Sequence, residues 1–486
     1  MNRHITHCGN MSAKKKMPDW VLKHKKKGIE IERKGNNYYA RRICSVWDPD
    51  KGRPQKKTLE YLGKVTPEGI IPSMRKQKTE IGAILEAGHI AFLKRFIDNI
   101  SEPLIEIFPK DWQNILSSAC IKLCYQEPFS RMKIRHDTSW SRRLWPGAAL
   151  SKNSITGLLP RIGRQWNAQR EFFKEISKDE KHMAIDLSHI FSNSQNINWL
   201  ELRHNPEDVW KPQLEILLMW GTSNNRPGFM KLLPGATHSA SSLANAIWES
   251  GLQDVIAIMD KGFYSQANVE FLEESGIQYA IALKRDLPII DHKTHLKYNK
   301  YFHYKKHAQW WRSTDLGNGR VIYHFLDKTL ADNEESNYLA MIEEGKMKKT
   351  DYNRLKRRFG TLSIITDTGL SAEEVYHLYK ERREIEYAFE AFKKTLDADV
   401  TWMRTKESMQ GYLFIHFVAL HLYSQVLDHL KRKELLEKYS VMDILTYLSK
   451  VCVVEVGGED RLAEVSKQTR KVIDLLEVPI TEILGL

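Results

Sequence analysis

HMAIDLSHI, residues 182–190, is an apolar run with one acidic residue, Asp186, at its centre. The run has the length and composition of a β-strand. An ionised carboxylate inside an apolar strand is costly unless a cation lies beside it. Asp186 is therefore a candidate site residue, although one acidic residue in a strand is weak evidence by itself.

The residues that follow this strand predict the rest of a sheet. We expect strands at 210–221, 228–236, 255–260 and 278–283, with helices at 241–251 and 266–276. Three strands followed by alternating helix and strand is the order of a mixed sheet with helices packed on it. The predicted fold class is thus α/β. A short strand at 360–367 and a helix from Ser371 extend the pattern.

A second acidic residue, Asp260, ends the apolar run VIAIM at a predicted junction between strand and loop. Gly262 allows a tight turn beside it. The carboxyl ends of strands are where open α/β sheets place their sites. For Asp186 or Asp260 taken alone, the competing interpretation is a capping or turn residue.

The helix at 376–394, YHLYKERREIEYAFEAFKK, gathers four polar residues on one face. Tyr379, Arg382, Glu386 and Lys393 are separated by 3, 4 and 7 residues, which at about 100° per residue places them within an arc of about 60°. The alternative is a solvated helix face on which Arg382 and Glu386 form an i, i+4 pair.

These four residues form the pattern Y-x2-R-x3-E-x6-K, which resembles the signature of one branch of the DDE transposases of bacterial insertion sequences. In that branch the Glu is the third acid of a catalytic triad, so the resemblance assigns Glu386 to catalysis.

Two upstream segments are similar to the same family. Asp186 is followed closely by Ser188, and Asp260 opens the sequence Asp-Lys-Gly-Phe, in which the family more often has Arg where this chain has Lys261. Lys261 can still bind phosphate but cannot form a bidentate fork. The gaps of 74 and 126 residues between successive acids resemble the arrangement in which a mainly β insertion precedes the third acid. The resemblance covers roughly residues 180–425 and, more loosely, 29–65.

The resemblance implies an RNase H-like fold, with Asp186 and Asp260 on neighbouring strands and Glu386 on a helix that crosses the sheet. Three converging carboxylates would raise one another's pKa unless a cation were present. Two Mg²⁺ (or Mn²⁺) ions suit such oxygen ligands and catalyse phosphoryl transfer on DNA. By position in the signature, Tyr379, Arg382 and Lys393 inherit the role of holding the DNA strand.

An adjacent tryptophan pair, Trp310 and Trp311, lies in a polar, aromatic-rich stretch that we interpret as the insertion. The usual role of such a pair is packing. The family resemblance offers instead stacking on a base extruded from the duplex.

Composition restricts the class of protein. The 486 residues, 42% hydrophobic, exclude a small disulfide scaffold and wholesale disorder. Residues 1–66 contain 17 Lys or Arg and 6 Asp or Glu, so +11 of the net charge of +13 lies there. This end is expected to bind double-stranded DNA, the element ends and the target.

Five cysteines without a C-x-x-C pair indicate a reducing compartment. The longest apolar run, 411–427, is shorter than the roughly 20 residues of a membrane span and predicts a core helix. The N-terminus lacks the apolar region of a secretory signal. We expect a bacterial cytoplasmic protein, associated with the nucleoid and without a membrane partner.

Six segments are expected along the chain. They are a basic mobile arm (1–28), an α+β DNA-binding module (29–165) with helices over 75–135, a first core part (180–283), a β-rich insertion (284–358), a second core part with the Glu386 helix (359–425) and a helical C-terminal region (426–486).

The sequence therefore predicts a transposase that acts as a homodimer in its synaptic complex and performs metal-dependent cleavage and strand transfer at the ends of its own insertion sequence. Two alternatives stay open: an RNase H-like nuclease or recombinase without strand transfer, and a catalytically inactive DNA-binding derivative. The intact acids and signature disfavour the derivative. A paired-carboxylate glycosidase is disfavoured by the basic N-terminal end.

Overall fold

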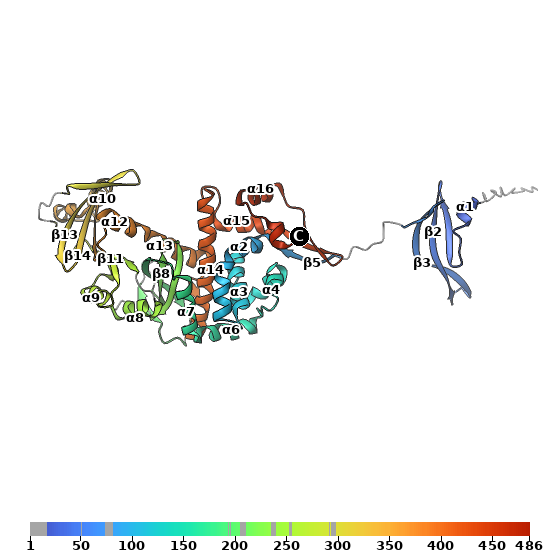
Figure 1. Ribbon diagram of the computed structural model, residues 1–486, viewed down its shortest axis with the longest axis horizontal. Coiled ribbons are helices and arrows are strands. Elements are labelled where there is room, and N and C mark those ends of the chain that lie inside the picture. The colour runs from blue at the N-terminus through green and yellow to red at the C-terminus, as the bar shows by residue number, and fades with distance from the viewer. Residues whose placement is uncertain are drawn as a thin grey trace, which may run out of the picture. The chain divides into compact units, whose positions relative to one another are not determined.

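The computed structural model describes residues 17–49, 51–72, 81–192, 194, 196–204, 210–234, 240–251, 255–290, 292 and 298–486 (Figure 1). The chain divides into two compact units. The first comprises residues 1–82 with 456–458, and the second comprises 83–455 with 459–486. Asp186, Asp260 and Glu386 all belong to the second unit.

The first unit is an antiparallel β-meander, as expected, with a fourth short strand added. Its strands are β1 (Ile29–Lys34), β2 (Asn37–Asp48), β3 (Arg53–Thr66) and β4 (Gly69–Ile71). A one-turn helix, α1 (Asp19–Leu22), packs on the sheet through Val21, which is fully buried. The expected arm of residues 1–28 is therefore corrected at 19–22, which belong to the folded unit, while residues 1–16 lie outside the described residues.

A mixed sheet of 11 strands organises the second unit and confirms the expected α/β class. The strand order is β12-β13-β14-β15-β11-β10-β6-β8-β7, with β9 paired to β8 and β16 paired to β6. The strands are β6 (His182–Ser192), β7 (Glu201–His204), β8 (Trp210–Gly221), β9 (Arg226–Leu233), β10 (Ile256–Met259), β11 (Gln278–Ala282), β12 (Lys300–Tyr304), β13 (His307–Gly317), β14 (Arg320–Asp327), β15 (Thr361–Thr366) and β16 (Val400–Thr401).

The register of the central strands positions the site. β10 pairs in parallel with both β6 and β11, and its four residues are all buried, which explains why IAIM is apolar without alternation. Ile185 lies opposite Met259 in this register. Asp186 and Asp260 each follow one member of that pair, so the two carboxylates meet at the same edge.

The helices of the second unit surround the sheet and a central helix, α14 (Lys406–Arg432). In chain order the others are α2 (Gly88–Ile107), α3 (Trp112–Tyr125), α4 (Met132–Thr138), α5 (Ser141–Leu144), α6 (Lys152–Arg164), α7 (Trp166–Ile176), α8 (Ala240–Ser250), α9 (Gln266–Glu274), α10 (Lys328–Glu343), α11 (Tyr352–Leu355), α12 (Ala372–Glu381), α13 (Arg383–Glu390), α15 (Val441–Ser449), α16 (Lys467–Leu476) and α17 (Ile480–Leu484). Figure 1 shows α14 standing between β8 on one side and α2, α3 and α6 on the other.

The apolar run at 411–427 is the buried middle of α14, as expected for a core helix. Within the part of the chain that the structure describes, no helix combines the length and the apolar character needed to cross a membrane.

The N-terminal helices do not form a module with the β-meander. α2, α3 and α6 pack on α14 in the second unit, so the expected boundary near residue 165 is wrong and the division falls at 82. The physical reason is that α14 is apolar almost all round and must be covered on both sides.

Two further expectations need correction. Residues 81–86, expected to be helical, form strand β5 (Ile81–Glu86). The C-terminal region is not wholly helical, because β17 (Cys452–Val456) and β18 (Glu459–Leu462) form a hairpin in the sheet β18-β17-β5. Gly457 and Gly458 both have positive φ, 63° and 87°, as a tight hairpin turn requires.

The expected β-rich insertion contains β12, β13 and β14, which extend the main sheet through the pairing of β14 with β15. It also contains helix α10, which the polar sequence at 328–336 did not suggest.

The contact between α6 and α14 gives a test of the packing. A Cβ added at Gly163 would lie 1.8 Å from the carbonyl oxygen of Glu407, whereas a Cβ at Gly157, also in α6, meets nothing within 4 Å. We expect Gly163→Ala to lower the free energy of unfolding by several kcal/mol, because backbone must move. Gly157→Ala should raise it by about 0.5–1 kcal/mol, since Ala favours a helix over Gly. Equal effects of the two substitutions in urea unfolding would contradict this packing.

Candidate active site

Asp186, Asp260 and Glu386 converge on one guanidinium, that of Arg382. Its Nη1 lies 3.1 Å from Asp186 Oδ2, and its Nη2 lies 3.8 Å from Asp260 Oδ1 and 2.7 Å from Glu386 Oε1. The side chain of Arg382 is only 11% exposed, whereas that of Glu386 is 53% exposed. The structure thus joins β6, the loop after β10 and α13 through a single cation.

Tyr379 completes this cluster. Its hydroxyl donates a hydrogen bond to Asp260 Oδ1 at 3.2 Å. Burial raises the pKa of the Tyr379 hydroxyl to about 12, so the phenol stays protonated and can donate. Tyr379 and Arg382 therefore both lie beside the acids, as the four-residue pattern predicts.

Burial dominates the electrostatics of Asp186. It raises the pKa of this carboxyl to about 6, against the lowering effects of Arg382 and of the backbone N–H of Leu187, which donates to Asp186 Oδ1. The carboxylates of Asp260 and Glu386 add smaller raising effects. For Arg382, burial works against the charged form, but Tyr379 and the three acids outweigh it and raise the pKa of the guanidinium.

The helix that carries the pattern is not continuous. α12 ends at Glu381, a turn centred on Arg382 follows with i to i+3 backbone hydrogen bonds, and α13 begins at Arg383. Residues 391–395 then form a π-helical turn, η6 (Ala391–Thr395). The assumption of about 100° per residue along 379–393 is therefore wrong, because both irregularities change the rotation.

Lys393 is the residue most affected by these irregularities. Its Nζ lies 3.4 Å from His189 Nε2 and 3.7 Å from Asp399 Oδ1. Lys393, on η6, thus lies beside His189, three residues along β6 from Asp186.

Lys261 is exposed in the 3₁₀ turn η3 (Lys261–Phe263) directly after Asp260. Its place beside the second acid agrees with a role in phosphate binding, which stays a prediction.

Trp310 and Trp311 lie on opposite faces of β13, as neighbouring strand residues must. Trp311 and Tyr379 both pack against a buried cluster that includes Phe302, Val375 and Tyr376. The Nζ of Lys300 lies 4.7 Å from the centroid of the Trp311 ring. Trp310 contacts Tyr301, at 5.4 Å between ring centroids, and Lys328. Only Trp311 shares a sheet face with α12.

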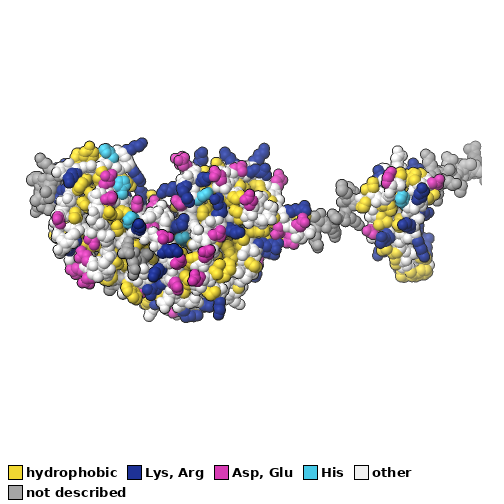
Figure 2. Space-filling view, viewed as in Figure 1, with side chains coloured by type: hydrophobic (Ala, Val, Ile, Leu, Met, Phe, Trp, Pro, Cys, Tyr) yellow, Lys and Arg dark blue, Asp and Glu magenta, His cyan; other side chains and the backbone are white. Residues whose placement is uncertain are grey.

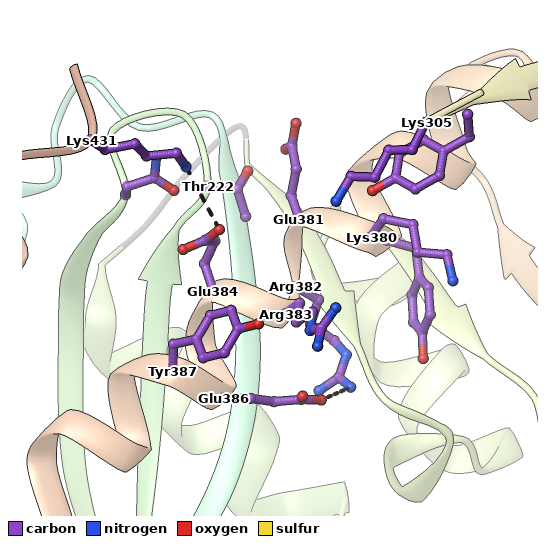
Figure 3. A pocket seen from close by; sticks show the side chains of 13 residues that line it. Thr222, Lys305, Lys380, Glu381, Arg382, Arg383, Glu384, Glu386, Tyr387 and Lys431 are labelled. Atoms are coloured by element: carbon purple, nitrogen blue, oxygen red, sulfur yellow. Dashed lines mark hydrogen bonds and ion pairs between the residues drawn. The ribbon is translucent and has the colours of Figure 1, made fainter. Parts of the chain in front are cut away.

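A cavity of about 670 Å³ opens beside α12 and α13 (Figure 3). Tyr379, Arg382 and Glu386 line it. Four further basic residues, Lys305, Lys380, Arg383 and Lys431, line its wall, and none of them was among the predicted site residues. For two of these a signal existed in the charged run KERRE at 380–384, while Lys305 and Lys431 come from distant segments that only the fold brings near.

The three carboxylates have the charge and the ligand type that a divalent cation requires. Three carboxylates with one guanidinium carry a formal charge of −3 + 1 = −2, and oxygen ligands suit Mg²⁺ or Mn²⁺. As positioned, however, no three His, Cys, Asp or Glu side chains of the described residues are grouped closely enough to hold a metal ion. The three carboxylates fit such a cation by charge and ligand type, and in this structure the guanidinium of Arg382 lies between them.

Part of the chain is similar to a known family of transposases. Residues 201–422, a little under half of the chain, match the family model described as transposase DDE domain. Asp260 and Glu386 lie within the match, and Asp186 lies before it. None of the curated proteins matches this chain in sequence.

Two solved structures show limited likeness. A piggyBac transposase synaptic complex with hairpin DNA matches with a TM-score of 0.36 and 9% identity, over 82% of this chain and 80% of that one. A Mos1 transposase paired-end complex with left transposon end matches with a TM-score of 0.15 and 12% identity, over 39% of this chain and 57% of that one. Both scores are low, so the fold rests on the strand order and register described above.

The raised pKa of Asp186 predicts a pH-dependent effect on stability. Because an unfolded Asp titrates near 3.9, the ionised carboxylate costs the metal-free folded chain up to about 3 kcal/mol above pH 6 and nothing below about pH 4. Asp186→Asn should therefore raise the free energy of unfolding in EDTA at pH 8, and the gain should vanish near pH 4. Denaturant unfolding at both pH values measures it, and a loss of stability at pH 8 would contradict the assignment.

Proposed function

We propose that this chain is a transposase that cleaves and joins DNA strands at the ends of its own insertion sequence, using an RNase H-like core. The observation that carries the proposal is the convergence of Asp186, Asp260 and Glu386 from three separate elements. The strand order β9-β8-β6-β10-β11, antiparallel and then parallel, supports the RNase H-like assignment, since it places two acids on neighbouring strands.

We infer that these three acids hold two Mg²⁺ or Mn²⁺ ions once Arg382 has moved from between them. When bound, such ions supply activation of a water or 3′-hydroxyl and stabilise the departing oxygen. Arg382 and Tyr379 would then bind the phosphates beside the scissile one, because both are buried donors already positioned at the acids. Lys261, from the loop after β10, and Lys393, further along β6, would bind flanking phosphates.

The proposed partners are double-stranded DNA and a second copy of the chain in the synaptic complex, in the bacterial cytoplasm at the nucleoid. The first unit is proposed to recognise the element ends, because most of the net charge lies in residues 1–66. The boundary between the units falls after residue 82, so a chain that starts at Ile81 lacks almost all of the first unit. If this shortened chain binds the element ends with unchanged affinity, the first unit does not recognise them.

The catalytic assignment predicts the behaviour of three conservative variants. Asp186→Asn, Asp260→Asn and Glu386→Gln should each lower Mg²⁺-dependent nicking of an end-bearing duplex at least about 1,000-fold, while binding of that duplex stays within about threefold. Glu384→Gln is the matched control. Glu384 lies on the same helix, α13, but forms its ion pair with Lys431 instead of Arg382, so nicking should stay near the wild-type rate. Full nicking by Glu386→Gln would remove it from the triad.

The same assay separates the alternatives. A nuclease without strand transfer would release cut ends but never join them to a target duplex, and an inactive derivative would bind ends without Mg²⁺-dependent nicking. Joined products from the wild-type chain, absent from all three variants, are the expected result.

We further propose that Trp311, which shares a sheet face with Tyr379, stacks on a base drawn from the duplex. Trp311→Ala should slow the step after first nicking more than nicking itself, and an abasic nucleotide at the flipped position should restore much of the rate. Trp310→Ala, on the opposite face, is the control. Equal slowing of both steps without abasic rescue would indicate packing.

A further inference from the structure

Trp402 is a large aromatic residue that packing does not explain. Its side chain is 72% exposed, and it lines a cavity of about 440 Å³ together with Lys152, Arg404 and the hydroxyl residues Ser130, Thr156 and Ser408. No acidic residue lines this cavity, and among the described residues no ion pair is found for Lys152 or Arg404. An open indole beside two cations is a combination that suits a nucleotide.

The backbone around Trp402 is well anchored. β16, which ends one residue before it, pairs with the end of β6, with Val400 opposite Phe191 and Thr401 opposite Ser192. On its other side α14 begins at Lys406 and packs closely on α6, where Lys152 lies (Figure 1). The short loop that carries Trp402 and Arg404 is therefore held at both ends by paired and packed elements.

β6 connects this cavity to the acids. From Asp186 to Ser192 the strand advances six residues, about 20 Å at roughly 3.3 Å per residue. Between these ends lies His189, with the Nζ of Lys393 3.4 Å from its Nε2. Arg382 contacts Asp186, Lys393 contacts His189, and Thr401, three residues before Arg404, pairs with Ser192 at the end of the strand. At about 3.4 Å per nucleotide, a 20 Å span corresponds to about six nucleotides.

We propose that the cavity at Trp402 binds a nucleobase of the DNA strand about six nucleotides from the scissile phosphate, with Lys152 and Arg404 on the adjoining phosphates. This inference rests on the proposed function. DNA is favoured over a protein partner because the cavity offers cations without acids, whereas a protein surface would be met by mixed charge.

A second exposed tryptophan provides the matched control. Trp248 is also 72% exposed, but the guanidinium of Arg170 already covers its ring at 5.2 Å. Its indole thus already has a cationic partner within the chain.

The test measures binding of the full chain in EDTA to two fluorescein-labelled 20-nucleotide strands, oligothymidine and an abasic strand with the same phosphates. The wild type should prefer oligothymidine. Trp402→Ala should reduce that preference about fivefold or more, Trp402→Phe should retain most of it, and Trp248→Ala should leave it unchanged. Arg404→Gln and Lys152→Gln should weaken the binding of both strands. Each should also reduce the slope of the logarithm of the binding constant against the logarithm of the salt concentration by about 0.7.

Three outcomes would overturn the inference. If Trp402→Ala prefers oligothymidine over the abasic strand as strongly as the wild type does, no base stacks on Trp402. Because the wild type still binds DNA in that case, the proposed function is not affected. A Trp402→Ala chain that binds DNA normally but changes from dimer to monomer in sedimentation assigns the surface to a second copy. Absence of DNA binding by the wild type would overturn the proposed function as well. Thermal unfolding of the variants checks that each is folded.

Discussion

The contacts of Arg382 with Asp186, Asp260 and Glu386 are the constraint on which the site depends. The guanidinium lies within 3.8 Å of all three carboxylates while being almost buried. Without it, an ionised Asp186 would stand in an apolar strand with two like charges beside it. The turn between α12 and α13 falls at the same residue, Arg382, whose side chain contacts the sheet at Asp186.

Under the proposed function, a single cation, Arg382, lies between carboxylates that would hold two divalent ions, so metal binding would depend on the DNA substrate. In the proposed complex, DNA phosphates would compete with the carboxylates for Arg382, because both are oxyanions that accept from a guanidinium. Each phosphate that binds Arg382 leaves the acids more negative and therefore better ligands for a metal ion. Binding of DNA and binding of metal are thus expected to favour each other, as linkage requires when both displace the same contact.

Most of the central strands of the main sheet could be predicted from the sequence, since HMAIDLSHI and VIAIMD are apolar runs of strand length bounded by turns. The meeting of the acids was also predictable, from strand order and from a resemblance at Tyr379, Arg382 and Glu386. The position of Lys393 could not be predicted in this way. The turn at Arg382 and the π-helical segment change the rotation per residue, and neither contains a Pro or Gly that would indicate an irregularity. The boundary at 82 was missed because packing of α2, α3 and α6 on α14 is a long-range contact without a local signal.

The signals for two other features were present but weaker. Gly457-Gly458 between short alternating runs indicates a hairpin, and an apolar α14 requires helices on both sides. Trp402 gave no signal of its own, because exposure is a property of the fold and only the pairing of β16 with β6 places it beside the path from Asp186.

Anomalous diffraction of Mn²⁺ in a crystal of the chain with cleaved DNA would test most directly whether Asp186, Asp260 and Glu386 hold the metal ions. We predict manganese peaks between Asp186, Asp260 and Glu386, with the guanidinium of Arg382 bound to a DNA phosphate. Manganese bound elsewhere, with Arg382 still bridging the three carboxylates beside the scissile phosphate, would contradict it.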